Sequence, residues 1–271
     1  MADLVDLSLV TGAALWGAAA GALLPRAAHR FAVPDEEPWR SHCPGGHRLR
    51  GWLGRVPCRS CASGEPGASG VADAGEAGEA GTSYAGEAVA SYAPSALLLA
   101  AATALTCAVL ALATGVRPEL AVWLVLAPAG VLLGVVDVRV RRLPDPLTLP
   151  LASAALGLLA LAAVLPEHAG HWLTALYGAL ALGGGYLTLF LINPAGMGFG
   201  DVKLALGMGA VLGWYGWPTV LLGTFAGFLS GALYGGALVV TRRADRKSAI
   251  PFGPFLLAGA FAGLLVGAFT A

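Results

Sequence analysis

Two aspartates stand at the boundaries between apolar and polar stretches of this chain. Asp137 ends a long apolar run, and Asp201 follows a glycine-rich stretch. An ionised carboxyl group buried alone in hydrocarbon is costly, so each must be solvated, paired or used chemically. When two carboxyl groups lie near each other, one retains a proton and acts as an acid, while the other acts as a base that activates water. Such a pair can hydrolyse peptide bonds without a metal or a covalent intermediate.

The residues after Asp137 predict a break between two helices. Leu143 and Pro144 do not continue a helix comfortably, because proline lacks an N–H and restricts the preceding residue. Asp145 and Pro146 then open the next apolar run, as a helix cap and a first-turn proline. We therefore interpret Asp145 as a cap that helps to shape the site rather than as a catalyst.

The stretch before Asp201 carries glycine at alternating positions, Gly196, Gly198 and Gly200. Glycine permits both positive φ and close backbone approach, and the sequence leaves these two explanations open. The loop can bring Asp201 toward Asp137 or admit an extended peptide, although a short glycine motif alone is weak evidence. Lys203 is either a membrane-boundary anchor or an ionic partner of Asp201, and we favour the partner role.

Composition indicates an all-helical, polytopic integral membrane protein. Only 12% of the 271 residues are charged, against roughly 25% in soluble domains, and the mean hydropathy is +0.73. The formal net charge is zero, which argues against a nucleic-acid partner and leaves the lipid bilayer as the expected surroundings. The apolar runs, one of them short, predict about eight transmembrane helices. These are residues 7–24, 95–114, 120–136, 147–165, 172–192, 204–212, 218–240 and 254–269.

The run 204–212 is too short to cross a bilayer alone, so it either extends through Trp214 or is a half-helix among its neighbours. Basic residues concentrate in the loops that carry the two aspartates, which predicts that both aspartates face the cytoplasm and both termini face outward. Trp172, Trp214 and Trp217 are then expected in the outer aromatic belt.

The sequence divides into four parts. Residues 1–25 form a first transmembrane helix, and residues 26–62 form a cytoplasmic segment that contains Cys and His. Residues 63–94 are rich in Gly, Ala, Glu and Ser and are interpreted as a flexible linker. Residues 95–271 form the transmembrane core. The crowded Ala and Gly of the spans, as in residues 178–185, are interpreted as helix-packing positions.

The N-terminal insertion carries a set of metal-ligand side chains. Cys43, Cys58 and Cys61, together with His47 or His42, make a Cys3His zinc site one interpretation, with reduced free thiols as the other. Cys107 lies in an apolar span and is expected to be a small core residue.

The combined motifs resemble the type IV prepilin peptidases, which are polytopic aspartyl proteases. The resemblance rests on Asp137 with its following Leu-Pro-Asp, on the stretch from Gly198 to Leu204, and on Ile-Pro-Phe-Gly-Pro-Phe at residues 250–255. It covers nearly the whole chain, with the motifs in the expected order. It implies that Asp137 and Asp201 are the catalytic pair, that Gly196, Gly198, Gly200, Lys203 and Asp145 shape the site, and that residues 251–254 support the fold.

The implied reaction removes the short basic leader of prepilins or pseudopilins at the cytoplasmic face of a bacterial inner membrane, and needs no cofactor. Bifunctional members also methylate the new N-terminus with S-adenosylmethionine, and they carry two Cys pairs in the N-terminal insertion. Gly46 stands where one of those cysteines is expected, which argues against methylation and breaks the zinc pattern.

Two other classes of protein remain as hypotheses. A small ion-coupled transporter also uses membrane acids and glycine-broken helices, although its charges are expected near mid-span. A thiol–disulfide enzyme using Cys58 and Cys61 would need an oxidising compartment, which the predicted cytoplasmic placement opposes.

Overall fold

Helices make up nearly all of the regular structure in the computed structural model, which describes residues 2–34, 37–43, 45–54, 95–194, 196–241 and 251–271. Within these ranges one isolated antiparallel bridge, between His42 and Arg48, accompanies the helices. The prediction of an all-helical chain is therefore confirmed for the described residues. The helices are α1 (Ala2–Phe31), α4 (Ala96–Thr114), α5 (Glu119–Val140), α6 (Asp145–Ala162), α7 (Trp172–Ile192), α8 (Phe199–Trp214), α9 (Trp217–Val240) and α10 (Gly253–Thr270).

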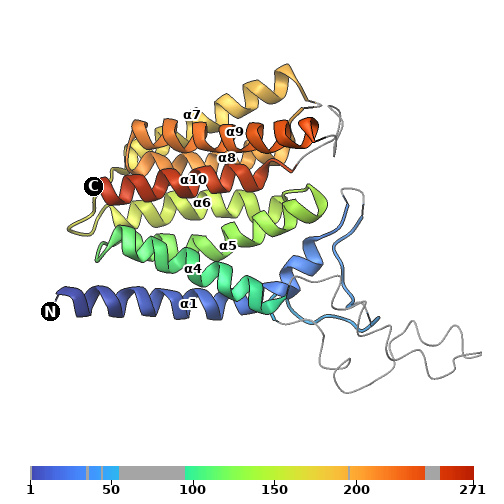
Figure 1. Ribbon diagram of the computed structural model, residues 1–271, viewed down its shortest axis with the longest axis horizontal. Helices are drawn as coiled ribbons and strands as arrows, with labels where there is room; N and C mark the ends of the chain where they lie inside the picture. Colours follow the sequence, from blue (N-terminus) through green and yellow to red (C-terminus); the bar gives the residue numbers. More distant parts are fainter. Residues whose placement is uncertain (1, 35–36, 44, 55–94, 195, 242–250) are drawn as a thin grey trace, which may run out of the picture.

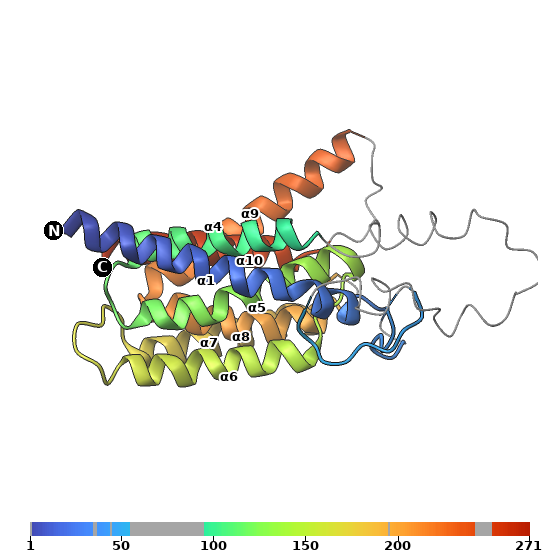
Figure 2. The ribbon, with the colours of Figure 1, turned by 90° about the horizontal axis from the view of Figure 1, so that it is seen from below.

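The helices run back and forth along one main direction, from which α9 diverges toward its C-terminal end (Figures 1 and 2). Both chain termini lie at the same end of the bundle (Figure 1). The connections from α5 to α6 and from α7 to α8 therefore lie together at the opposite end. This is the arrangement that the two aspartate motifs require if they are to meet.

Seven of the described helices are long and apolar enough to cross a membrane, namely all except α8. This bears out the prediction of a polytopic membrane protein. Helix α1 continues to Phe31, with Pro25 inside it, and so runs past the boundary that the first apolar run suggests at residue 25.

Helix α8 is the buried centre of the C-terminal half. It has 16 residues and contacts α6, α7, α9 and α10. It extends through Trp214, so of the two alternatives for the run 204–212 the longer helix is the one observed. Trp214 itself is fully buried and its ring lies 5.8 Å from that of His168. The expectation that Trp214 belongs to an exposed aromatic belt is wrong, because α8 is covered by its neighbours.

Glycines set the close approach of α7 to α8. A Cβ atom at Gly209 would collide with the backbone of Gly178, and one at Gly213 would collide with the carbonyl of Thr174. Backbones that approach so closely need glycine at the contact. The packing interpretation is confirmed for Gly178, whereas a Cβ at Gly184 would meet no atom within 4 Å.

The described part of the N-terminal insertion is attached to the end of α1. Arg26 donates a hydrogen bond of 2.8 Å to the carbonyl of Arg50, and Arg30 donates one of 2.8 Å to the carbonyl of Gly51. The guanidinium of Arg30 also lies 4.0 Å from the centroid of the Trp52 ring. The predicted linker, 63–94, lies outside the described residues.

Candidate functional site

Asp137 lies in the last turn of α5 and is 4% exposed. Helix α5 ends because Arg141 adopts a left-handed conformation with φ of 52°, and its N–H bonds to the carbonyl of Asp137. The Asp137 carboxylate accepts a hydrogen bond from the backbone N–H of Gly253, with 3.0 Å between nitrogen and Oδ2. Gly253 opens α10, so a residue 116 positions away holds this carboxylate in place.

Asp201 lies in the first turn of α8 and is 7% exposed. Its N–H donates to the carbonyl of Gly198 at 3.0 Å, and the backbone of Gly198 also hydrogen-bonds to its carboxyl group. The carboxyl groups of Asp137 and Asp201 are close enough to interact electrostatically. The fold therefore brings together two acids that the sequence could only place on one face of the membrane.

The alternating glycines act through close approach rather than positive φ. Gly198 has an ordinary extended backbone, with φ of −73°. A Cβ at Gly200 would lie 2.8 Å from the Cβ of Leu143, and one at Gly196 would collide with the side chain of Asn193. The start of α8 therefore fits directly against the Leu-Pro break that follows α5.

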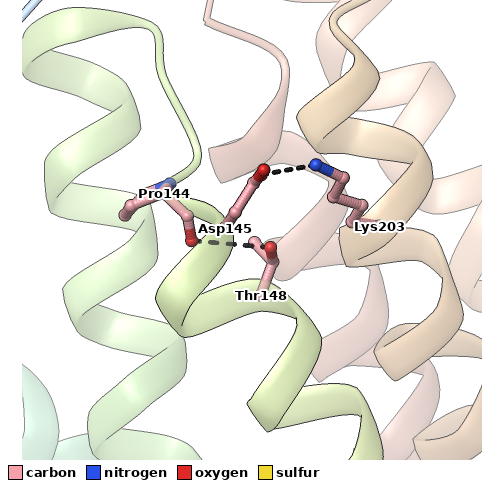
Figure 3. A network of polar contacts seen from close by, with 4 residues as sticks. All are labelled: Pro144, Asp145, Thr148 and Lys203. Atoms are coloured by element: carbon pink, nitrogen blue, oxygen red, sulfur yellow. Dashed lines mark hydrogen bonds and ion pairs between the residues drawn. The ribbon is translucent and has the colours of Figure 1, made fainter.

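A second contact joins the two motifs. The Lys203 ammonium on α8 lies 2.6 Å from the Asp145 carboxylate on α6, and the two side chains point toward each other (Figure 3). The expected partnership of Lys203 with Asp201 is therefore wrong for the described contacts. The ammonium also lies 4.7 Å from the centroid of the Phe199 ring.

Asp145 does not cap α6 as expected. The cap position falls on Pro144, whose side chain has no hydrogen-bonding group, and Asp145 is the first helical residue. Its carboxylate instead reaches across to Lys203, while Thr148 donates to the carbonyl of Pro144 at 3.5 Å (Figure 3). Proline at positions 144 and 146 leaves the first turn with few free N–H groups to cap, which explains the difference.

Comparison with known proteins shows which family the sequence matches. Residues 124–236 match the model of the type IV leader peptidase family, and this segment contains both aspartates. The leader peptidase HopD of Salmonella typhimurium is 36% identical over 147 residues, which cover 52% of this chain and 88% of HopD.

The chain belongs to the type IV leader peptidase family.

Other members of the family match over a similar region. The prepilin leader peptidase/N-methyltransferase of Aeromonas salmonicida is 37% identical over 140 residues, covering 49% of this chain and 44% of the relative. The protein of the same name from Pseudomonas aeruginosa is 34% identical over 146 residues, covering 50% and 46%. The matches thus span less than half the length of these two relatives. No solved structure matches the chain. Because all three relatives are named as leader peptidases, a transporter is not favoured.

Two residues near the aspartates were not found as site residues from the sequence. Gly253 acts through its backbone, so no side chain marks it. Tyr186 on α7 is 2% exposed and interacts electrostatically with Asp201, and its hydroxyl has no hydrogen-bond partner among the described residues. A phenol in an apolar span, near the glycine-rich stretch, is the signal that could have found it.

Two of the predicted metal ligands lie in the described part of the N-terminal insertion. Cys43 and His47 lie in a tight hairpin, in which the Cys43 N–H donates to the carbonyl of His47 at 2.9 Å. The Cys43 sulfur lies 3.7 Å from the Nδ1 of His47. Cys58 and Cys61 lie outside the described residues. Cys107 is fully buried, as expected of a core residue.

Proposed function

We propose that this chain is a membrane aspartyl endopeptidase that removes the leader peptide from type IV prepilins or pseudopilins. The observation that carries the proposal is that Asp137 and Asp201 lie at one end of the bundle, each almost fully buried and close enough together to interact electrostatically. Two such acids supply the proton donor and the proton acceptor that peptide hydrolysis requires.

The proposed reaction uses water as the nucleophile. The ionised carboxylate takes a proton from water as its oxygen attacks the scissile carbonyl carbon. The protonated carboxyl group then gives its proton to the leaving nitrogen as the C–N bond breaks, so the products are one carboxyl group and one amine. Because the two acids exchange roles over a cycle, the titration belongs to the pair rather than to either residue.

The neighbours of the pair have supporting roles in this proposal. The N–H of Gly253 fixes Oδ2 of Asp137. Gly200 keeps the start of α8 close to Leu143, Gly196 leaves room for the Asn193 side chain and Gly198 lies beside the Asp201 carboxylate. The ion pair of Lys203 with Asp145 ties α8 to α6. These residues shape the site without taking part in proton transfer.

The proposed location is the inner membrane of a bacterium, with the aspartates on the cytoplasmic side. The basic residues of the loops at the aspartate end support this orientation, because positive charge favours the cytoplasmic side. A substrate with a polar leader and an apolar helix fits a site at a membrane boundary, since its two parts remain in water and in lipid.

We also propose a zinc site in the N-terminal insertion, formed by Cys43, His47, Cys58 and Cys61. Tetrahedral zinc with ordinary bond lengths sets its sulfur and nitrogen ligands about 3.6 Å apart, close to the 3.7 Å between Cys43 and His47. The metal would stabilise the insertion and has no part in hydrolysis. Elemental analysis of purified protein tests this, with about one zinc per chain expected and none in Cys43→Ser; equal zinc in both would refute the ligand set.

Methyl transfer is named in two of the relatives and not in HopD. The peptidase assay below reads it directly when S-adenosylmethionine is added.

Co-expression with the prepilins of the same cell tests the peptidase. Wild type is expected to shorten the substrate on a gel, with N-terminal sequencing placing the cut before the apolar helix. Asp137→Asn and Asp201→Asn should each slow cleavage by at least about 10²-fold, because each removes one member of the acid–base pair. Equal membrane levels of the three proteins are the control. Normal cleavage by either variant would refute its catalytic role.

A further inference from the structure

A long apolar cleft lies between α5 and α10, with α6 and α8 as its floor. Its volume is about 510 Å³. On α5 the lining residues recur every three or four positions from Trp123 to Arg139, so they form one continuous face of the helix. That face is roughly 24 Å long at the rise of an α-helix. The cleft is therefore elongated along the bundle rather than a closed chamber.

The opposite wall of the cleft is one face of α10. Pro254, Leu257, Phe261 and Leu264 of α10 line the cleft at helical spacing. Leu204 and Met208 of α8 line its floor. The lining is almost wholly apolar, so the cleft suits a hydrocarbon surface rather than a polar molecule.

Two glycines of α5 open onto this cleft. A Cβ at Gly130 would meet no atom within 4 Å, and one at Gly134 would make only an ordinary contact of 3.5 Å with Leu257. These glycines therefore differ from Gly209, where the neighbouring backbone fills the space. Small residues that have open space or only an ordinary contact among the described residues leave room for the close approach of another helix.

One end of the cleft lies at the level of the contact between Asp137 and Gly253. Val138 and Pro254 line that end, and each is the next residue after a member of the hydrogen-bonded pair Asp137 and Gly253. Neither aspartate lines the cleft, so the leader of a rod-shaped occupant would have to continue beyond this end to reach the Asp137 carboxylate.

We propose that this cleft is the docking groove for the apolar helix of the substrate, which lies along α5 with its leader end toward Asp137. The inference rests on the proposed peptidase function and adds the substrate-binding surface. A protein segment within the membrane must satisfy its own backbone hydrogen bonds, so the occupant is a helix. Bound lipid is the competing occupant, and it is separated by the experiment.

Photocrosslinking of the full-length protein in membranes tests the groove. A photoreactive phenylalanine analogue replaces Gly134 in the cleft or, as the control, Leu221 on α9, which is 69% exposed. Both forms carry Asp201→Asn so that a co-expressed prepilin is retained. The Gly134 position is expected to give at least about tenfold more prepilin adduct than the Leu221 position, and mass spectrometry should map it to the apolar helix. Equal adducts, or lipid adducts alone at Gly134, would overturn the proposal.

Filling the cleft gives a second measurement. Gly130→Leu is expected to raise the KM for prepilin about tenfold with little change in kcat, because it removes binding surface and leaves the aspartates in place. Gly236→Leu on α9, where a Cβ would also meet no atom within 4 Å, is the matched control and should cleave normally. An unchanged KM in Gly130→Leu would overturn the groove.

The two experiments separate the inference from the proposed function. Cleavage by wild type without a groove adduct would refute the groove and leave the peptidase standing. A groove adduct without cleavage by wild type would refute the peptidase and leave a prepilin-binding groove. Neither cleavage nor adduct would refute both.

Discussion

At the residue scale, the most informative contact is the one between Asp137 and the N–H of Gly253. A Cβ added at Gly253 would lie 2.8 Å from Oδ2 of Asp137, so glycine is needed for the carboxylate to reach the backbone. The hydrogen bond and the absence of a side chain thus serve the same purpose. A side chain introduced at this position would therefore displace the Asp137 carboxylate.

Gly253→Ala is expected to slow leader cleavage by about 10²-fold, because the added methyl group shifts a reacting group that needs accurate placement. The rate of prepilin shortening at equal protein level measures this. Gly236→Ala, at an open position of α9, should retain normal cleavage. A normal rate in Gly253→Ala would show that the placement of Asp137 does not depend on this approach.

The ion pair of Lys203 and Asp145 predicts a non-additive effect on cleavage. Asp145 is 61% exposed and Lys203 15%, so the coupling energy in unfolding should stay below about 1 kcal/mol. Lys203→Met, Asp145→Asn and the double variant are expected to lose similar amounts of cleavage activity, since each breaks the same tie between α6 and α8. Additive losses would mean that the two residues act separately.

The residue types and their surroundings in the sequence predict part of the candidate site. Asp137 and Asp201 are conspicuous because charge is rare in an apolar chain. Gly253 is not conspicuous, since a backbone N–H leaves no trace in the sequence. Lys203 was given the wrong partner because the sequence places it beside Asp201, whereas the helix directs its side chain toward α6.

At the element scale, α8 determines how the C-terminal half packs. Its small residues let α7 lie against it, and its first turn carries Asp201. Hydropathy could not decide the fate of this helix, because 16 residues are too few for a span and the covering helices are distant in sequence. The contact between Gly178 and Gly209 is likewise visible only when the helices are placed together.

Gly209→Val should destabilise the protein by at least about 1–3 kcal/mol, since its side chain would have to enter the backbone of α7. Thermal unfolding in detergent measures this as a lowered midpoint. Gly184→Ala on α7 is the matched control, because its Cβ meets no atom within 4 Å, and should unfold like wild type. Identical midpoints for all three proteins would contradict the observed packing.

At the scale of the whole molecule, the sequence predicts a bundle of membrane-spanning helices with both aspartates at one end. The common end of the aspartates follows from the alternation of the helices, and the structure bears this out. Of the eight predicted spans, seven correspond to described helices long enough to cross a membrane, and the eighth corresponds to the shorter α8. The joining of three distant motifs does not follow from either. It depends on which helices pack side by side. The apolar pattern of a helix does not identify its neighbours, because lipid and protein interiors are equally apolar.

Cysteine labelling in intact cells tests the proposed orientation. Pro166→Cys lies in the exposed loop before α7, and Thr241→Cys lies at the end of α9, on the side of the aspartates. A membrane-impermeant maleimide should modify the first in intact spheroplasts and the second only after permeabilisation, relative to the parent protein. The reverse pattern would place the aspartates outside the cell.

The hydrogen bond between Asp137 on α5 and Gly253 on α10 also has a consequence for the synthesis of the protein. Ribosomes make α10 after every other described helix, so Asp137 enters the membrane long before the N–H that holds it exists. A growing chain therefore contains both acids without a finished site. Under the proposed function, a molecule without α10 would lack the N–H that places Asp137, and full cleavage activity would appear only after α10 has inserted.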